Sequence, residues 1–287
     1  MTPYRKVLVA YDGSEGSRIA AIHAALLAKR LGAELRAIWV RGHLPHYPET
    51  IDEIDEEQET AREFFDRITS YLQSLGQEKG IEIQCEMRSG HPARTILEAT
   101  TEHDADLIIL GNRGHSRLWG GFLGHTADRV SEHAPCSVLI VRSAEEDAQF
   151  RRLLIGFDGS PGAEIALQHS FSLAKQLGSQ VHVIWVHETH GRDSIPSQGS
   201  VERRFRHILP RINASAAAAG IEVRCVFKTG NPAKAIIAEA EAGRFRVVAL
   251  GHRGSSGMWG RFLGGVADRV SEQAHCDVLI VREKRPD

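Results

Sequence analysis

Residues 111–142 read GNRGHSRLWGGFLGHTADRVSEHAPCSVLIVR, and residues 251–282 read GHRGSSGMWGRFLGGVADRVSEQAHCDVLIVR. Of these 32 aligned positions, 22 are identical. The stretches that open the two copies also match, because VLVAYDGS at 7–14 corresponds to LLIGFDGS at 153–160. A repeat of about 140 residues is too long for one unit of a solenoid and has the size of a whole domain. The chain is therefore predicted to contain one domain twice.

A charged stretch divides the two copies. Residues 143–149 read SAEEDAQ and separate two apolar runs. We place the first domain at residues 1–145 and the second at residues 149–287 of this chain of 287 residues. Asp12 corresponds to Asp158 at an offset of 146 residues, whereas the offset is 140 in the C-terminal part of each copy. One copy has therefore gained or lost six residues between these points.

The composition excludes several classes of protein. Hydrophobic residues make up 42% and charged residues 25%, and the formal net charge is −2, so the chain lacks the basic excess of a nucleic-acid-coating protein. No apolar run approaches the roughly 20 residues of a membrane span, and no signal segment opens the chain. Four cysteines, none spaced as Cys-x-x-Cys, form no disulfide framework. We expect a cytoplasmic protein without a nucleic-acid or membrane partner.

Each copy alternates short apolar runs with stretches of helical spacing. The strands predicted for the first copy are 7–10, 35–40, 81–87, 106–110 and 137–141. The helices predicted between them are 14–31, 52–77, 92–101 and 127–133. The strands predicted for the second copy are 153–157, 181–186, 221–227, 247–250 and 278–281. This alternation indicates an α/β fold with an open, doubly wound parallel sheet in each copy, where ligands bind beyond the carboxyl ends of the strands.

Two segments of the first copy follow the carboxyl ends of predicted strands and carry chemistry. Asp12 follows the first strand, and Gly111, Gly114 and Gly124 lie in the loop after the fourth. Glycines permit positive φ and a close approach of backbone to ligand, and N–H groups at the following helix start favour an anion. Arg113 would add a charge-assisted bond to phosphate, and Asp12 would accept from an amine or a ribose hydroxyl. The alternative is that the glycines only form a tight loop.

The spacing Gly-x2-Gly-x9-Gly after a buried strand, with an aspartate ending the first strand, resembles the universal stress protein family. The closing APCSVLIVR at 134–142 is also typical of that family. The resemblance covers nearly the whole chain, twice. It implies a five-stranded parallel sheet of order 3-2-1-4-5 in each half. It also implies that the halves pair through their fifth strands as a pseudo-dimer, and it leaves a further homodimer open.

Some members of this family bind ATP, with the aspartate at the adenine end, strand two against the base and the glycine loop around ribose and phosphates. The resemblance therefore implies an adenine-nucleotide site for ATP, with or without Mg²⁺. In the first half the implied residues are Asp12, Val40, Gly111, Arg113, Gly114, Gly124, His125 and Thr126. In the second half they are Asp158, Val186, Gly251, Arg253, Gly254, Gly264 and Gly265.

The chain departs from the family at the position after the last glycine, where Ser or Thr is usual. The first half has His125 there, with Thr126 one residue later, and the second half has Gly265 and Val266. One missing neutral hydrogen bond costs about 1 kcal/mol, or roughly fivefold in affinity, so we expect the first half to be the better site. An imidazolium at His125 would favour ATP near pH 6 over pH 8. Alternatively, His125 points to solvent and only starts the helix.

These observations favour a stress-response protein that binds ATP as a binding or regulatory module. A slow ATP-hydrolysing enzyme and an interaction protein without nucleotide are the alternatives. No catalytic residue is predicted, since the chain lacks the Gly-x4-Gly-Lys-Ser/Thr, Gly-x-Ser-x-Gly and His-Glu-x-x-His motifs. His43 and His46 follow the second strand of the first copy, and His187 and His190 that of the second, so a shared transition metal is a lesser hypothesis.

Overall fold

The computed structural model describes residues 4–42, 51–112, 114, 123–143, 150–189, 198–254 and 263–283. The predicted boundary between the domains falls at 143–149, and of these residues only Ser143 is described. Within the described residues, no helix combines the length and the apolar character that a membrane crossing requires.

The two halves contain the same order of elements, as the repeat predicts. The first half contains β1 (Lys6–Ala10), α1 (Glu15–Leu31), β2 (Glu34–Arg41), α2 (Ile51–Lys79), β3 (Ile83–Ser89), α3 (Pro92–Glu102), β4 (Leu107–Gly111), α4 (His125–His133) and β5 (Ser137–Val141). The second half contains β6 (Arg152–Gly156), α5 (Pro161–Leu177), β7 (Gln180–Glu188), α6 (Gln198–Ala219), β8 (Val223–Gly230), α7 (Pro232–Ala242), β9 (Val247–Gly251), α8 (Gly265–Gln273) and β10 (Asp277–Val281). The clearest difference is α2, which has 29 residues against 22 in α6.

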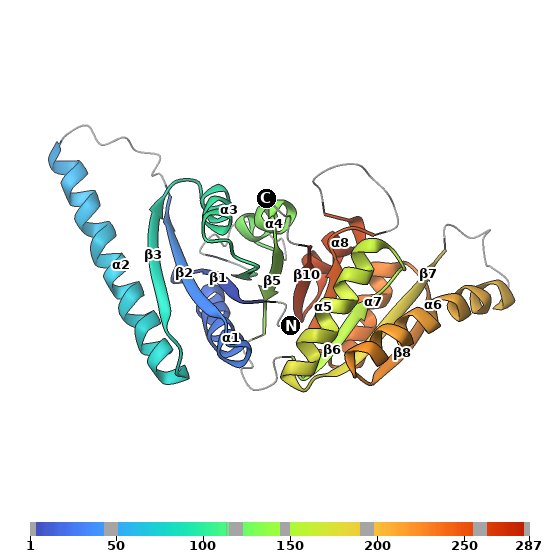
Figure 1. Ribbon diagram of the computed structural model, residues 1–287. Helices are drawn as coiled ribbons and strands as arrows, with labels where there is room; N and C mark the ends of the chain where they lie inside the picture. The colour runs from blue at the N-terminus through green and yellow to red at the C-terminus, as the bar shows by residue number, and fades with distance from the viewer. Residues whose placement is uncertain are drawn as a thin grey trace.

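The strands form one continuous sheet of ten strands in the order β3-β2-β1-β4-β5-β10-β9-β6-β7-β8. Each half therefore has the predicted order 3-2-1-4-5. The halves join where β5 and β10 pair antiparallel, with Leu139 opposite Leu279. Figure 1 shows the two halves side by side, with β5 and β10 adjacent at the centre and α2 and α6 at opposite ends of the molecule. The predicted pairing of the halves through their fifth strands is confirmed.

Helices cover both faces of the sheet, and the strands are apolar for that reason. In β1, Val7 and Val9 pack in the core beneath α1, α2, α5 and α6. Leu8 points to the opposite face and packs in the core beneath α3, α4, α7 and α8. Because successive side chains enter different cores, central strands such as β1 and β5 are short apolar runs, whereas the edge strands β3 and β8 carry exposed polar residues.

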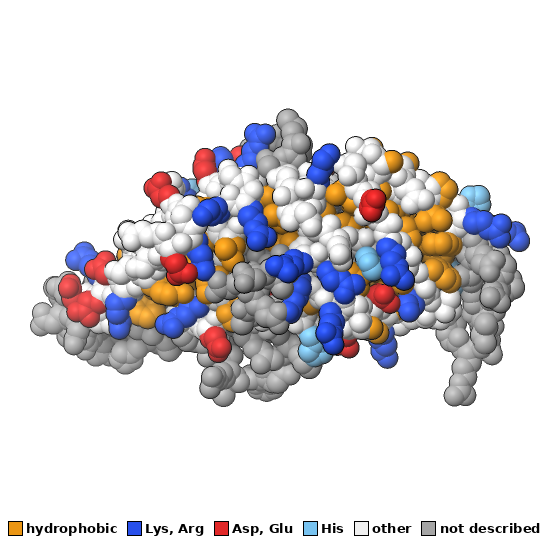
Figure 2. Space-filling view, turned by 90° about the horizontal axis from the view of Figure 1, so that it is seen from below, with side chains coloured by type: hydrophobic (Ala, Val, Ile, Leu, Met, Phe, Trp, Pro, Cys, Tyr) orange, Lys and Arg blue, Asp and Glu red, His pale blue; other side chains and the backbone are white. Residues whose placement is uncertain are grey.

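Charge is unevenly distributed over the surface. In the view of Figure 2, Lys and Arg side chains gather across the middle of the molecule, and acidic side chains are more scattered. Since the whole chain carries a net charge of −2, this excess is local. A nearly neutral chain can thus present a basic face.

The seam between the halves contains a buried carboxylate. Asp277, at the start of β10, is 1% exposed. Its Oδ1 accepts from the backbone N–H groups of Arg142 at 2.8 Å and Ser143 at 3.1 Å. Its Oδ2 lies 3.5 Å from Nδ1 of His23 in α1, which is also 1% exposed. The equivalent position in β5 is Ser137, whose hydroxyl accepts from Arg282 N–H at 3.2 Å. The seam is therefore asymmetric in charge.

Acidic side chains of α4 and α8 influence one another across this seam. Burial raises the pKa of Glu272, and the nearby Asp268 and Asp128 raise the pKa further. A carboxyl group with a raised pKa in the folded state destabilises that state at neutral pH, and the penalty disappears below the ordinary carboxyl pKa. Glu272 also lies in the last turn of α8, where the helix dipole disfavours negative charge.

Replacing Glu272 with glutamine is therefore expected to raise the free energy of unfolding by about 0.5 kcal/mol at pH 7. The gain should vanish as the pH falls below about 4, where the wild-type carboxyl group is protonated in both states. Urea denaturation at both pH values measures the difference. Glu63→Gln, at an exposed position in α2, is the matched control and should change little. A destabilised Glu272→Gln protein would contradict the expected repulsion.

Candidate functional site

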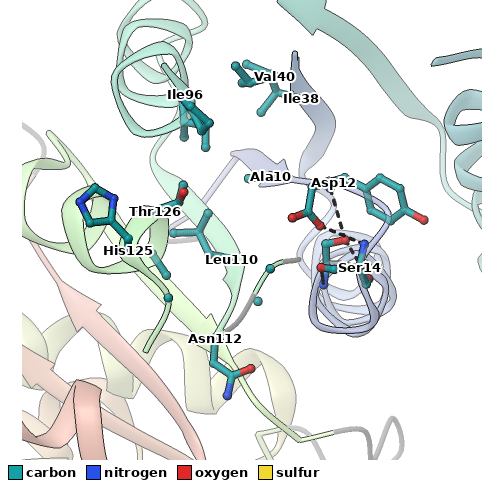
Figure 3. Close-up of a pocket in the computed structure, with 17 residues that line it drawn as sticks. Ala10, Asp12, Ser14, Ile38, Val40, Ile96, Leu110, Asn112, His125 and Thr126 are labelled. Carbon is teal, nitrogen blue, oxygen red and sulfur yellow. Dashed lines mark hydrogen bonds between the residues drawn. The ribbon is translucent and has the colours of Figure 1, made fainter. Parts of the chain in front are cut away.

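A cavity of about 270 Å³ lies at the carboxyl ends of β1, β2 and β4 in the first half. Its walls divide into an apolar part and a polar part (Figure 3). The apolar part comprises Ala10, Ile38, Val40, Ile96 and Leu110. The polar part includes Asp12, Ser14, Ser17, Asn112, His125 and Thr126. The cavity can thus hold a molecule with one apolar flat end and one polar end.

Asp12 is fixed at the rim of this cavity by the turn that follows β1. Its Oδ1 accepts from the backbone N–H of Ser14 at 3.0 Å, and its own N–H donates to Ser17 Oγ at 3.3 Å. Gly13 between them has a φ of 82°, which a residue with a side chain rarely adopts. The carboxylate therefore has a defined position before any ligand arrives.

The glycines after β4 serve close approach rather than positive φ. A Cβ on Gly114 would lie 2.7 Å from Asp12 Oδ2, so the backbone at Gly114 passes close to the carboxylate. A Cβ on Gly111 would lie 2.5 Å from the backbone of Gly16, so this glycine lets the end of β4 pack against α1. Gly124 has a φ of −74°. The expectation of positive φ is thus wrong for Gly124, and Gly111 has a packing role.

The N-terminus of α4 opens into the cavity without a side-chain cap. Its N-cap is Gly124, whose carbonyl accepts from Asp128 N–H at 2.9 Å, so the first intrahelical bond reaches only the fourth residue of the helix. The N–H groups of the first three residues have no acceptor inside the helix. Gly124 and these three residues, through Ala127, line the cavity. By contrast, Ser14 Oγ caps α1 by accepting from Ser17 N–H. The open end of α4 is suited to an anion.

His125 and Thr126 lie on different sides of this helix start. His125 is exposed, and its ring centroid lies 6.4 Å from that of His91, the N-cap residue of α3. In Figure 3 the His125 ring lies on the outer side of α4, whereas Thr126 lies nearer the space between Asp12 and Ile96. Thr126 therefore presents a hydroxyl group to the cavity, although it lies one residue after the position where the family has Ser or Thr. The role of His125 beside phosphate stays a prediction, and Arg113 lies outside the described residues.

The second half has a larger cavity, of about 650 Å³, at the equivalent strand ends. All seven residues implied by the resemblance line it: Asp158, Val186, Gly251, Arg253, Gly254, Gly264 and Gly265. Asp158 repeats the turn of Asp12, because its Oδ1 accepts from Ser160 N–H at 2.9 Å. Helix α8 begins after Gly264, again without a side-chain cap. The backbone frame of the site is thus present twice.

One position of α2 beside the turn at Gly13 differs between the two halves. Phe64 packs on Trp39 with ring centroids 5.1 Å apart, and its Cζ lies 3.5 Å from the position of a Cβ on Gly13. The equivalent position in α6 is Arg204, so the second half has no phenylalanine there. The second cavity extends past Trp185 to His207 and Ile208 of α6.

The hypothesis of a metal shared by histidines finds no support in the part of the chain that the structure describes. No group of three or more His, Cys, Asp or Glu side chains there is arranged to hold a metal ion. His187 lines the second cavity, but its predicted partner His190 lies outside the described residues, as do His43 and His46.

The universal stress protein family model matches this chain twice, over residues 3–142 and residues 149–282. The chain therefore belongs to the universal stress protein family. It is a two-domain member, and relatives match it over nearly their whole length. A universal stress protein of Mycolicibacterium smegmatis is 27% identical over 291 residues and 97% of each chain is covered. One from Mycobacterium tuberculosis H37Rv is 26% identical, with 96% of this chain and 97% of the relative covered.

Solved structures show the same fold over both halves. The crystal structure of a universal stress protein from Archaeoglobus fulgidus has a TM-score of 0.75 to this chain, with 98% of this chain and 99% of that one covered. The two sequences are only 23% identical. The likeness therefore concerns the fold.

Proposed function

We propose that this universal stress protein is a stress-response module that binds an adenine nucleotide, ATP, at the carboxyl edge of its sheet. The observation that carries the proposal is the first cavity, which has apolar walls, a fixed carboxylate at its rim and an uncapped helix N-terminus at one side. These three features match the base, the ribose and the phosphates of one nucleotide. Each half has the same frame, so the second cavity is a further site of this class.

The apolar walls suit the adenine ring. Ile38 and Val40 at the end of β2 and Ile96 of α3 line one side of the cavity in Figure 3. A flat, weakly polar ring gains most from burial against such aliphatic side chains. Asp12 stands beside this region, where its carboxylate can accept from a ribose hydroxyl or an adenine amine.

The phosphates are expected at the start of α4. The N–H groups of His125, Thr126 and Ala127 are the free donors of this helix, and the Thr126 hydroxyl adds another. Mg²⁺ would arrive on the phosphates of the nucleotide, since the described residues contain no three-ligand metal site. We expect the first half to bind ATP more tightly, because the second half has Gly265 and Val266 where a hydroxyl is needed.

Asp12 is the residue whose loss tests the proposal best. Asp12→Ala removes a charged acceptor and is expected to weaken ATP binding about tenfold or more, because hydrogen bonds to charged groups contribute about 1.5–3 kcal/mol. Asp12→Asn keeps an acceptor for the N–H of Ser14 and loses only the charge, so it separates ligand recognition from the local turn. Calorimetric titration with ATP measures both variants against wild type.

Asp158→Ala is the matched variant in the second half. It should affect the tighter site less than Asp12→Ala does, because it lies in the other cavity. Equal losses of the tighter site in both variants would contradict the preference for the first half. Unchanged ATP binding in Asp12→Ala would overturn the assignment of this carboxylate.

A further inference from the structure

An arginine of each half contacts the helix that begins at the cavity of the other half. Arg282 follows β10 in the second half, and its guanidinium donates to the carbonyl oxygens of Ser131 and Ala134 at the end of α4. It also donates to the carbonyl oxygen of Glu132 at 3.1 Å. Arg142 follows β5 in the first half and donates to the carbonyl oxygen of Ser271 in α8. The two contacts are equivalent and crossed.

The guanidinium of Arg282 is buried and has fixed hydrogen-bond partners. The residue is only 8% exposed, although it carries a full positive charge. The last carbonyl groups of a helix have no donor inside the helix and form the negative end of its dipole, so a guanidinium fork is the side chain best suited to them. Because the charge is buried and its donors are directed at fixed acceptors, the end of α4 cannot shift without losing these bonds.

The opposite end of α4 is attached to the first half itself. Gly124, its N-cap, donates its N–H to the carbonyl oxygen of Asn112 at 2.7 Å, and Asn112 donates to the carbonyl oxygen of Val141 at 3.0 Å. Helix α4 has nine residues and is therefore only about 13 Å long, so it moves as one body. The position of its N-terminal donors in the first cavity therefore depends on both attachments, the one to Asn112 and the one to Arg282.

We propose that Arg282 is a positioning residue for the nucleotide site of the first half, although it belongs to the second half. By the same geometry Arg142 positions the site of the second half. The inference rests on the proposed nucleotide binding, and it adds that each site is complete only when the other half is paired with it. Residues at the seam thereby act on N–H donors at the far end of a helix.

The test isolates the first site and then removes the arginine. Gly254→Val is expected to disable the second site, because a Cβ there would lie 2.9 Å from Asp158 Oδ2 and would displace that carboxylate. In this full-length background, Arg282→Gln is expected to weaken ATP binding five- to tenfold at 25 °C, with circular dichroism showing that the protein is folded. Arg282→Lys keeps the cation and loses the fork, so it should recover part of the affinity. Arg142→Gln, which removes the crossed contact to the disabled site, should change the first site less than twofold.

A purely structural role of Arg282 would give a different pattern. It would lower the melting temperature and leave the ATP affinity of the folded protein unchanged, which would overturn the inference. Equal weakening by Arg282→Gln and Arg142→Gln would also overturn it, since the effect would then belong to the seam as a whole. If the Gly254→Val protein binds no ATP before either arginine is changed, nucleotide binding by the first half itself is wrong, and the inference falls with it.

Discussion

Asp277→Ala is expected to lower the free energy of unfolding by about 3 kcal/mol. The carboxylate is 1% exposed and accepts from two backbone N–H groups of the other half, and His23 lies 3.5 Å away. Removing it leaves these partly buried donors without their acceptor and leaves a cavity where the carboxylate was. Urea denaturation followed by circular dichroism measures the change.

Ser137→Ala is the matched control, since Ser137 occupies the equivalent position of β5 and is also 1% exposed. It removes one neutral hydroxyl that accepts from Arg282 N–H, and about 1 kcal/mol is the expected loss. Asp277→Ser, which installs the residue of the first half, should fall between the two. A loss for Asp277→Ala no larger than that for Ser137→Ala would show that the buried carboxylate contributes nothing special to the seam.

Gly114→Val is expected to weaken ATP binding at the first site by about tenfold or more while leaving the fold intact. Its Cβ would lie 2.7 Å from Asp12 Oδ2, so the carboxylate or the loop must move, and both line the cavity. Gly114 is itself exposed, so the core is not disturbed. Calorimetric titration and a thermal melt of the same preparation separate the two effects.

Gly111→Ala, in the same segment, is expected to lose stability, whereas Gly114→Val is expected to lose ATP binding. Its Cβ would lie 2.5 Å from the backbone of Gly16, so this variant should lose several degrees of melting temperature. A Gly114→Val protein that melts normally and binds ATP like wild type would refute the placement of the nucleotide under this loop.

The fold could be predicted from the sequence because its central strands are buried on both faces. A run such as Leu107–Gly111 is apolar throughout and is bounded by polar turns, so strand and helix alternate visibly along the chain. The same alternation occurs in both copies of the repeat, so each predicted element is supported twice. The start of α2 was predicted to within one residue, at 52 against Ile51. The strands predicted at 81–87 and 221–227 begin two residues later, at Ile83 in β3 and Val223 in β8.

The site could be predicted only in part. Asp12, Gly114 and Thr126 meet because they follow neighbouring strands whose carboxyl ends share one edge. Ile96 was missed, since the face that α3 turns toward the cavity depends on how that helix packs on the sheet. The contact of Phe64 with Trp39 likewise depends on tertiary packing.

The contact of Arg282 could not be predicted for a related reason. Arg282 and Ser131 are 151 residues apart in the chain, and only the antiparallel register of β5 and β10 brings them together. The repeat predicts that the two halves pair. It does not predict which side chains cross the seam between them. The asymmetry between Asp277 and Ser137 is visible in the repeat, yet its consequence depends on the burial of both residues.

The central claim is that the first half holds an adenine nucleotide. Mass spectrometry of the small molecules released on denaturing the purified full-length chain tests it most directly. The account predicts that ATP is released from wild type after incubation with ATP and gel filtration, and that the Gly114→Val, Gly254→Val double variant releases almost none. A folded wild-type chain that releases no adenine nucleotide after the same treatment would contradict it.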